Sequence, residues 1–372
     1  MLLTLIVFIV VFSVVVFVHE FGHFSAARKL GVKVEEFGFG FPPRIAGIRR
    51  GDTIYSINWI PFGGFVRLKG ESGENVDPDS FVAQAPWKRV VILSAGVLMN
   101  VITAAVLLSI AFGIGIPSAL DQDQLASGGQ VSDHKLQIVT VVEGSPAEKA
   151  GLAVNDVIEK INGQEIRTVS DLQAATSQEP IEALELQYSH ENESKTLTVT
   201  PEIAEGDTTP KIGVAAAETG LVRYPWYQAL WLGPWYTLQL LWLIIVSLFE
   251  LFKLLFTQGM VSPDVAGPIG IAVVTGQVAK LGFVYVLQFT AVLSLSLAVM
   301  NILPIPALDG GRVFFVLLEK VRGKAVSPKV EGLVHTIGFY ALILFILVIS
   351  IQDINRFNIG DRVRDFFQSF GS

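Results

Sequence analysis

The sequence predicts a multi-span α-helical membrane protein with four transmembrane helices, a membrane-associated β-hairpin and one small extracytoplasmic α+β domain. Composition is the first reason, because 51% of the 372 residues are hydrophobic and 16% are charged, whereas soluble proteins carry about 25% charged residues. The second reason is a set of five apolar runs long enough to cross a bilayer: 1–18, 90–117, 224–249, 281–308 and 332–352. The third is a polar block, 118–223, which is long enough for one domain.

The first apolar run predicts a retained transmembrane helix rather than a cleaved signal peptide. No basic residue precedes it, no small-residue cleavage site follows it, and Arg28 and Lys29 come shortly after it. We therefore expect this helix to stay in the membrane with its N-terminus outside.

Basic residues are distributed unevenly between the apolar runs. Residues 28–89 contain ten Lys and Arg, and the short segment 309–331 contains five. The block 118–223 contains seven Lys and Arg against eighteen Asp and Glu. Because basic loops stay in the cytoplasm, we expect 28–89 and 309–331 inside a cell membrane and the acidic block outside it.

The third apolar run, 224–249, predicts a helix that lies along the membrane surface. An odd number of crossings must join the outer block to residue 309, so 224–249 and 281–308 do not both cross. The run 224–249 contains four Trp and two Pro residues, and Trp concentrates at membrane interfaces. The alternative is that 224–249 crosses and that 257–280 contains a re-entrant piece.

The motif His19-Glu20-Phe21-Gly22-His23 directly continues the first apolar run. Residues four apart share one helix face, so both imidazoles can bind a single Zn²⁺ ion. Glu20 can then act as the general base on the metal-bound water, whose pKa falls to about 7. The alternative is an interfacial polar cluster that matches the motif by chance. Against it, each ionisable group near the centre of a membrane helix costs about 2.5–3.5 kcal/mol.

A zinc site of this kind needs a third protein ligand. The sequence contains no cysteine, so that ligand must be His, Asp or Glu. Asp309 is the best candidate, because it follows the apolar run 281–308 at its cytoplasmic end, where Pro304 and Pro306 interrupt the helix. His335 is a weaker candidate, and a simple helix N-cap is the structural alternative for Asp309.

The second apolar run contains Gly96 and Asn100, four residues apart. This spacing predicts close packing against the first run, with the Asn amide bonding near the site. Ordinary small-residue helix packing explains the spacing equally well.

The motifs together resemble the site-2 protease family of intramembrane zinc metalloproteases, in its bacterial regulator-of-sigma-E branch. The resemblance covers nearly the whole chain and rests on the HExxH motif, the later Leu308-Asp309-Gly310 motif and the outer domain between them. It implies Zn²⁺ bound by His19, His23 and Asp309, with Glu20 as catalytic base. It also implies substrate-binding or supporting roles for Asn301, Asn100, Gly63 and Gly64.

Residues 55–68 predict a β-hairpin whose two β-prone arms flank Pro61-Phe62-Gly63-Gly64. A transmembrane substrate helix must be extended before its peptide bonds are open to attack. A free strand edge could bind the extended segment by strand addition. The family resemblance implies that this hairpin re-enters the membrane, and an ordinary cytoplasmic hairpin is the alternative.

The outer block reads as an α+β domain, with strands at 137–142, 184–188 and 195–199 and a short helix within 145–152. It resembles one PDZ domain of the bacterial protease type at 130–203. Such a domain can bind a peptide ligand or act as a size filter over the active site, and the sequence leaves both readings open.

The predicted function is regulated intramembrane proteolysis by attack of a zinc-bound hydroxide near the cytoplasmic side of the membrane. The expected substrates are single-span membrane proteins, either anti-sigma-factor-like proteins or remnant signal peptides. An inactive PDZ scaffold would have lost Glu20 or a ligand, and a metal transporter would carry ionisable residues along several spans. No phosphate-binding loop or basic stripe predicts a nucleic-acid partner. The predicted regions are a first protease half, the PDZ domain, surface helices and a second protease half, at 1–117, 130–203, 224–280 and 281–372.

Overall fold

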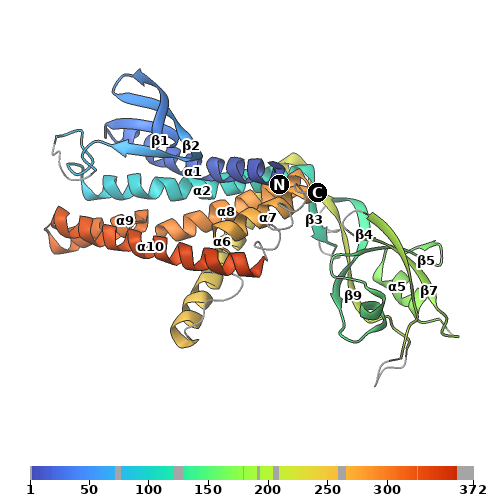
Figure 1. Ribbon diagram of the computed structural model, residues 1–372. Helices are drawn as coiled ribbons and strands as arrows, with labels where there is room; N and C mark the ends of the chain where they lie inside the picture. The colour runs from blue at the N-terminus through green and yellow to red at the C-terminus, as the bar shows by residue number, and fades with distance from the viewer. Residues whose placement is uncertain are drawn as a thin grey trace, which may run out of the picture. The chain divides into compact units, whose positions relative to one another are not determined.

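The computed structural model (Figure 1) describes residues 2–71, 77–120, 129–178, 180–190, 193–203, 209–258, 265–324 and 326–357. The chain divides into two compact units. Unit 1 joins Met1–Ile110 to Leu230–Ser372, and unit 2 is Ala111–Ala229. The end of the predicted second protease half, 358–372, lies outside the described residues.

Apolar helices dominate unit 1. They are α1 (Leu2–Lys29), α2 (Pro86–Ile114), α6 (Trp226–Gln258), α7 (Pro268–Leu281), α8 (Phe283–Ile302), α9 (Asp309–Arg322) and α10 (Pro328–Arg356), with the end of α2 and the start of α6 reaching into unit 2. Within the described residues, α1, α2, α6, α8 and α10 are long and apolar enough to cross a membrane. The predicted multi-helix membrane architecture is confirmed, and the number of helices that cross stays a prediction.

Proline and glycine residues set several helix boundaries. Proline begins α2, α7 and α10, where its missing N–H costs no hydrogen bond. The apolar run 281–308 is a helix only as far as Ile302, and Pro304 and Pro306 lie in the link to α9. The helix break that these prolines predict is therefore present.

The two long strands of unit 1 are β1 (Val34–Arg50) and β2 (Thr53–Leu68). They are joined at Gly51 and Asp52, so the predicted hairpin turn at 61–64 is wrong. β2 continues through 61–64 because Gly63, at φ 65°, bends the strand without reversing it. Phe37 consequently lies opposite both Tyr55 and Val66. The strands form one small sheet of four segments, in the order 64–68, 34–39, 53–58 and 44–50.

Helix α7 is held at its start and at its middle by other helices of unit 1. The buried carboxylate of Asp353, in the last turn of α10, accepts hydrogen bonds from Gly267 N (3.3 Å) and Gly270 N (2.7 Å). These groups belong to the first turn of α7, whose N–H groups have no partner within the helix. Further along, Gly276 packs against Thr4 near the start of α1. The start of α7 therefore lies beside the end of α10, and its middle lies beside the start of α1.

Unit 2 is an α+β domain built on an antiparallel sheet. The strands are β3 (Ile116–Ala119), β4 (Gln130–Val141), β5 (Val157–Ile161), β6 (Gln164–Glu165), β7 (Leu184–His190), β8 (Glu193–Val199) and β9 (Val214–Arg223), and the helices are α4 (Pro146–Ala150) and α5 (Val169–Thr176). The sheet order is β3-β9-β4-β5-β7-β8, with β6 beside β5. The predicted domain at 130–203 lies inside this unit, and β9, which pairs with β4, lies beyond it.

Candidate metal centre

Three side chains from two distant parts of the chain meet beside α1. His19 Nε2 lies 2.9 Å from Asp309 Oδ2, and His23 Nε2 lies 3.2 Å from the same oxygen. The two Nε2 atoms are 3.1 Å apart. Both imidazoles are buried, and Asp309 is half-buried. In the described part of the chain, this is the group of His, Asp and Glu side chains arranged to hold a metal ion.

The second nitrogen of each imidazole has its own partner on α2. His23 Nδ1 lies 2.8 Å from the backbone oxygen of Ile92. A carbonyl oxygen can only accept, so Nδ1 carries the proton and Nε2 presents its lone pair toward Asp309. His19 Nδ1 lies 3.3 Å from the amide of Asn100, which is fully buried.

The amide of Asn100 is best oriented with its oxygen toward His19. Asn100 Oδ1 has no hydrogen-bond partner among the described residues. Amide orientation is an assignment made from the hydrogen-bond network. With Oδ1 facing His19, it accepts the Nδ1 proton, and His19 then presents Nε2 to the cluster as His23 does. Asn100 and Ile92 thus hold the two rings in the same tautomer.

The α1–α2 contact has no room for side chains at two glycines. A Cβ atom at Gly22 would lie 2.7 Å from the carbonyl carbon of Ala95. A Cβ atom at Gly96 would lie 2.8 Å from His19 Cε1 and equally close to His23 Cε1. The second helix therefore reaches the imidazoles because glycine lets its backbone approach.

Asp309 is the first residue of α9 and not its N-cap, which is Leu308. Its carboxylate contacts the imidazoles, so the N-cap alternative is wrong. Gly310 and Gly311 permit the tight link before it, because Cβ atoms there would meet the backbone of Ile302 and Ile305. The Asn301 amide nitrogen, in the last turn of α8, lies 3.4 Å from His19 Nε2.

His335 supports this link and is not part of the cluster. Its Nδ1 accepts a hydrogen bond from Ala307 N at 2.9 Å, and Ala307 has a positive φ of 78°. The contact holds a strained backbone position two residues before Asp309. The weaker ligand candidate is therefore separate from the three clustered side chains.

Glu20 connects the cluster to the β-sheet. Its Oε2 accepts a hydrogen bond from Val66 N at 3.1 Å, so the edge segment 64–68 faces the site. Gly63 and Gly64 pack against Val16 and Phe17, one turn earlier on α1. They bring the strand against the helix, and their glycine identity is explained by this contact.

Several supporting residues have little signal in the sequence. Ser13 binds both Pro61 O (2.7 Å) and Gly63 N (3.3 Å), and Ser294 of α8 donates to Asn100 O at 2.9 Å. Each is a hydroxyl side chain within an apolar run, and this is the signal that the sequence offers. The ion pairs Arg89–Glu319 and Arg312–Glu71 line a cavity of about 250 Å³ beside α9 and join segments far apart in sequence.

Comparison with known proteins assigns the family. The model of peptidase family M50 matches residues 7–345. The chain belongs to peptidase family M50. This is the site-2 protease family, so the predicted resemblance is confirmed.

Relatives of this M50 peptidase support the enzyme assignment over almost its whole length. A Clostridium acetobutylicum protein is 33% identical over 94% of this chain and 97% of its own length. The regulator of sigma-W protease RasP from Bacillus subtilis is 30% identical over 95% of this chain and 98% of its own. The zinc metalloprotease RasP of Shouchella clausii is 30% identical over 95% of this chain and 99% of its own length. The chain is therefore a membrane zinc metalloprotease, as predicted.

One similarity to a solved structure falls within a small part of the chain. The PDZ domain of an SdrC-like protein from Listeria monocytogenes is 18% identical, covers 23% of this chain and 92% of its own, and gives a TM-score of 0.22. A TM-score this low does not decide the fold of unit 2, so its PDZ assignment stays a prediction.

The clustered donors suit the zinc ion that this family uses. Ligand atoms of a tetrahedral zinc site lie about 3.3 Å apart when the bonds are about 2.0–2.1 Å. The three distances of 2.9, 3.1 and 3.2 Å approach this value. Two neutral imidazoles and one carboxylate, with a fourth position left to water or substrate, form a donor set typical of catalytic zinc.

Proposed function

We propose that this M50 peptidase carries out regulated intramembrane proteolysis of single-span membrane proteins, with anti-sigma-factor-like proteins or remnant signal peptides as substrates. The observation that carries the proposal is the hydrogen bond from Val66 N to Glu20. It joins the candidate catalytic base to an open strand edge, beside the cluster of two histidines and Asp309 on an apolar helix. The name of the Bacillus subtilis relative, a regulator of sigma-W protease, supports the substrate class.

The residues around the cluster have distinct proposed roles. When bound by His19, His23 and Asp309, zinc would lower the pKa of a water molecule and polarise the scissile carbonyl. Glu20 is placed to take the proton from that water and later to pass it to the leaving amine. Asn301, 3.4 Å from His19 Nε2, is placed to donate to a substrate carbonyl beside the site.

The strand edge 64–68 is proposed to hold the substrate in an extended form. A helical substrate hides its peptide bonds in hydrogen bonds between residues four apart, so a cleavable segment must first unwind. An unwound segment can recover its backbone hydrogen bonds by adding to the free edge of β2. Because Val66 N binds Glu20 in the present structure, substrate would replace this bond as it places its carbonyl beside the base.

The proposed topology has four crossings, made by α1, α2, α8 and α10, with α6 along the outer surface. The contacts of Ser109 and Asp353 support it. Ser109 lies near the end of α2 and packs against Gly233 of α6, and Asp353 lies near the end of α10 and caps α7. Both ends are outside in the orientation that basic residues predict. The chain would then leave and re-enter the bundle on the same side, as a surface helix requires.

Unit 2 is proposed to be an extracytoplasmic PDZ domain of the substrate-selecting kind. Its acidic charge supports the outer location, because 118–223 carries seven Lys and Arg against eighteen Asp and Glu. The active site would then lie toward the cytoplasm in a cell membrane. Peptide binding and size filtering are both compatible with a sheet of this kind.

A Glu20→Gln variant tests the proposed reaction. We expect it to fold and to retain zinc, because the three ligands are untouched, but to lose cleavage by at least about 10²–10⁴-fold. Zinc is measured by elemental analysis of the purified protein, and cleavage with a single-span reporter. The same variant, expressed in the native host, should trap membrane peptides for identification by mass spectrometry.

A neighbouring acidic residue provides the control. Glu35→Gln removes a carboxylate after the same helix, away from the cluster, and should leave cleavage at the wild-type rate. Cleavage by Glu20→Gln at a comparable rate would exclude Glu20 as the base. Captured peptides that come from soluble proteins would exclude the proposed substrate class.

A further inference from the structure

The β1–β2 sheet has one apolar and one polar face. Residues opposite each other or two apart on a strand share a face. Phe39 lies opposite Ile57, and Ile48 lies opposite Tyr55. With Trp59, two residues after Ile57, these side chains form an exposed apolar face, in which Trp59 is 68% and Ile48 69% exposed. The other face carries the buried polar residues Glu36, Ser56 and Asn58, and the exposed Arg44 pairs with Glu36.

The apolar face follows α1 along the depth of the membrane. The Phe62 ring packs on Phe12, and the Phe39 ring packs on Phe17. At the other end, Arg28 donates to the Tyr55 hydroxyl at 3.4 Å. From Phe12 to Arg28, α1 rises by about 24 Å at about 1.5 Å per residue. The sheet thus extends from mid-helix to the basic end of a candidate span, Leu3–Lys29.

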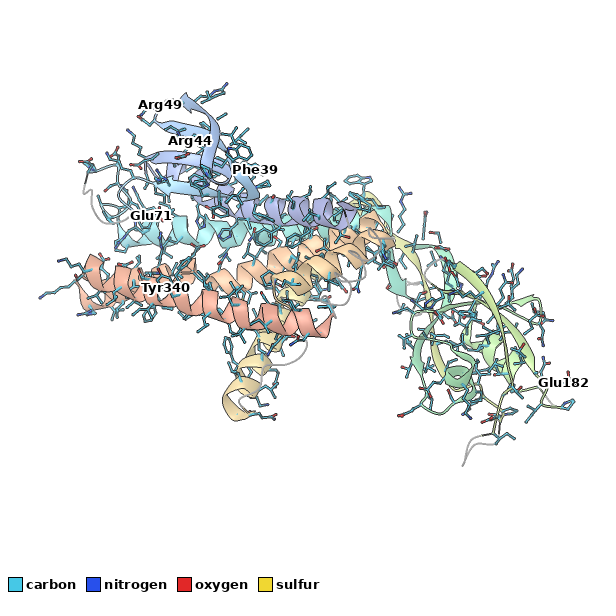
Figure 2. All side chains as sticks on the ribbon, viewed as in Figure 1. Phe39, Arg44, Arg49, Glu71, Glu182 and Tyr340 are labelled. Atoms are coloured by element: carbon cyan, nitrogen blue, oxygen red, sulfur yellow. The ribbon has the colours of Figure 1, made fainter. Side chains whose placement is uncertain are left out.

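Two arginines lie at the end of the sheet nearest that basic terminus. The strand register places Arg49 opposite Ile54 and Arg50 opposite Thr53, both beyond Tyr55. Figure 2 shows Phe39 close to α1 and Arg49 farther from that helix. Neither arginine makes an ion pair with a described residue. The nearby Asp52 is held by Lys33 at 2.9 Å, and mainly for this reason its pKa lies below the ordinary value.

A lipid surface explains both features together. The apolar face continues the exposed apolar side chains of α1, such as Phe21 and Val14, which a candidate span presents to acyl chains. The segment 44–50 leaves one backbone edge unpaired, which is costly in hydrocarbon but is satisfied among headgroups and water. An arginine at the level of the lipid headgroups attracts anionic lipids. A membrane of lipids without net charge would cover the apolar face, but it would give the two arginines no excess of negative charge.

We propose that the β1–β2 sheet is a binding surface for acidic phospholipids, with Arg49 and Arg50 on the headgroup phosphates and Phe39, Ile48, Ile57 and Trp59 against the acyl chains. The bound lipid also sets the position of the strand edge 64–68, which lies beside Glu20. β2 carries Trp59 in the lipid-facing part and Val66, which binds Glu20, in the next segment. Only this effect on cleavage rests on the proposed function, and lipid binding does not.

Brominated-lipid quenching of Trp59 fluorescence tests the lipid contact. The full chain, carrying Glu20→Gln so that catalysis plays no part, is placed in nanodiscs of phosphatidylcholine and phosphatidylglycerol, with one or the other brominated. The signal of Trp59 is the difference between this protein and its Trp59→Phe derivative. We expect stronger quenching by brominated phosphatidylglycerol. In Arg49→Gln with Arg50→Gln, this preference should fall by up to about 30-fold, or about 5-fold per arginine.

A matched pair on α9 is the control. Lys320→Gln with Arg322→Gln removes the same charge from exposed positions and should leave the Trp59 preference unchanged. Equal loss in both double variants would overturn the assignment to Arg49 and Arg50. Equal quenching by both brominated lipids in the unsubstituted sheet would overturn anionic recognition, and no quenching by either would show that another molecule or water covers the face.

Cleavage by the active enzyme tests the coupling. The rate should be higher in nanodiscs that contain phosphatidylglycerol than in phosphatidylcholine alone, and Arg49→Gln with Arg50→Gln should remove this difference. A rate independent of lipid, together with normal Trp59 quenching, would overturn the coupling and leave the lipid site intact. Absence of cleavage in every membrane, with normal quenching, would instead count against the proposed function.

Discussion

Asp309 is the single residue on which the candidate zinc site depends most. It contacts both imidazoles through one oxygen, at 2.9 and 3.2 Å. The chain has no cysteine, and His335 is bound to the Ala307 backbone instead. Within the described residues, no second carboxylate joins the cluster to replace it.

Asp309→Ala is expected to lower zinc content sharply, because two imidazoles alone make a weak site. The ion would otherwise hold α1 against the start of α9, so contact between these elements should loosen as well. Elemental analysis measures the zinc. Crosslinking between cysteines introduced beside His23 and beside Asp309 measures the contact.

Asp309→Asn is the conservative comparison. It keeps the shape of the side chain and should disturb folding less, while the neutral amide, a weaker ligand, still lowers activity. Full zinc occupancy and normal cleavage in Asp309→Ala would remove Asp309 from the site. His335 would then become the candidate to test.

At the scale of the elements, the closeness of α2 to α1 decides whether the site can form. Gly96 faces the two imidazoles, with no room for a Cβ atom, whereas a Cβ atom at Gly113 of the same helix would have its nearest neighbour at 3.9 Å. Replacing a helical glycine by alanine ordinarily stabilises a helix by about 1 kcal/mol. The two positions should therefore respond in opposite directions.

Gly96→Ala is expected to displace His19 and His23 and to reduce both zinc content and cleavage. Gly113→Ala should retain both and unfold at an equal or slightly higher temperature. Zinc analysis and thermal unfolding in nanodiscs measure the pair. Normal zinc content in Gly96→Ala would mean that α2 moves away from the imidazoles without loss.

The contact between α7 and α10 depends on one buried carboxylate. Asp353→Ala leaves the N–H groups of Gly267 and Gly270 without their acceptor, at about 1–3 kcal/mol for each unpaired buried group. We expect lower thermal stability and faster proteolysis near α7. Gln352→Ala, at the exposed neighbouring position, should behave like the wild type, and equal stability of the two variants would contradict the capping role.

The elements show where sequence patterns were sufficient and where they were not. Apolar runs predicted the long helices, and Pro304 with Pro306 predicted the break before Asp309, because both signals are local. A proline and two glycines at 61–64 imitate a hairpin turn and predict one where the strand in fact continues. Those glycines instead serve packing on Val16 and Phe17, a contact that depends on a helix far away in sequence.

At the scale of the whole molecule, the proposed topology assigns each segment to one side of the membrane. The side of the segment after α6 distinguishes four crossings from five. Helix α6, which precedes this segment, packs against the end of α2. Helix α7, which follows it, is capped by Asp353 near the end of α10. These two contacts and the distribution of basic residues favour the same answer.

A topology reporter fused after Phe256 should therefore report the same side as one at residue 180, and a reporter at residue 320 the opposite side. Alkaline phosphatase, active outside, and a fluorescent protein, active inside, give complementary readings. Opposite sides at 180 and 256 would show that α6 crosses and that the surface-helix proposal fails.

The sequence predicts the clustered side chains of the candidate site better than it predicts the groups that orient them. HExxH and the Asp309 motif named the clustered residues, since metal chemistry restricts residue type and spacing. The partners that orient them, such as Ile92 O on His23 and Val66 N on Glu20, are backbone atoms without a residue signature. Any side chain could have occupied these positions, so only the folded chain identifies them.

The distance along the chain between the proposed ligands has a consequence for biosynthesis. His19 and Asp309 are 290 residues apart, so the ion closes a loop that costs about 5 kcal/mol in chain entropy. At about 5–20 residues per second, a ribosome needs about 15–60 s to make that stretch. Throughout this time the first helix, as a proposed span, would already be in the membrane among other newly inserted proteins, while its proposed third ligand does not yet exist. With the proposed ligand set, a nascent chain would therefore be unable to cleave its neighbours, and proteolysis would start only when synthesis of the later helices is nearly complete.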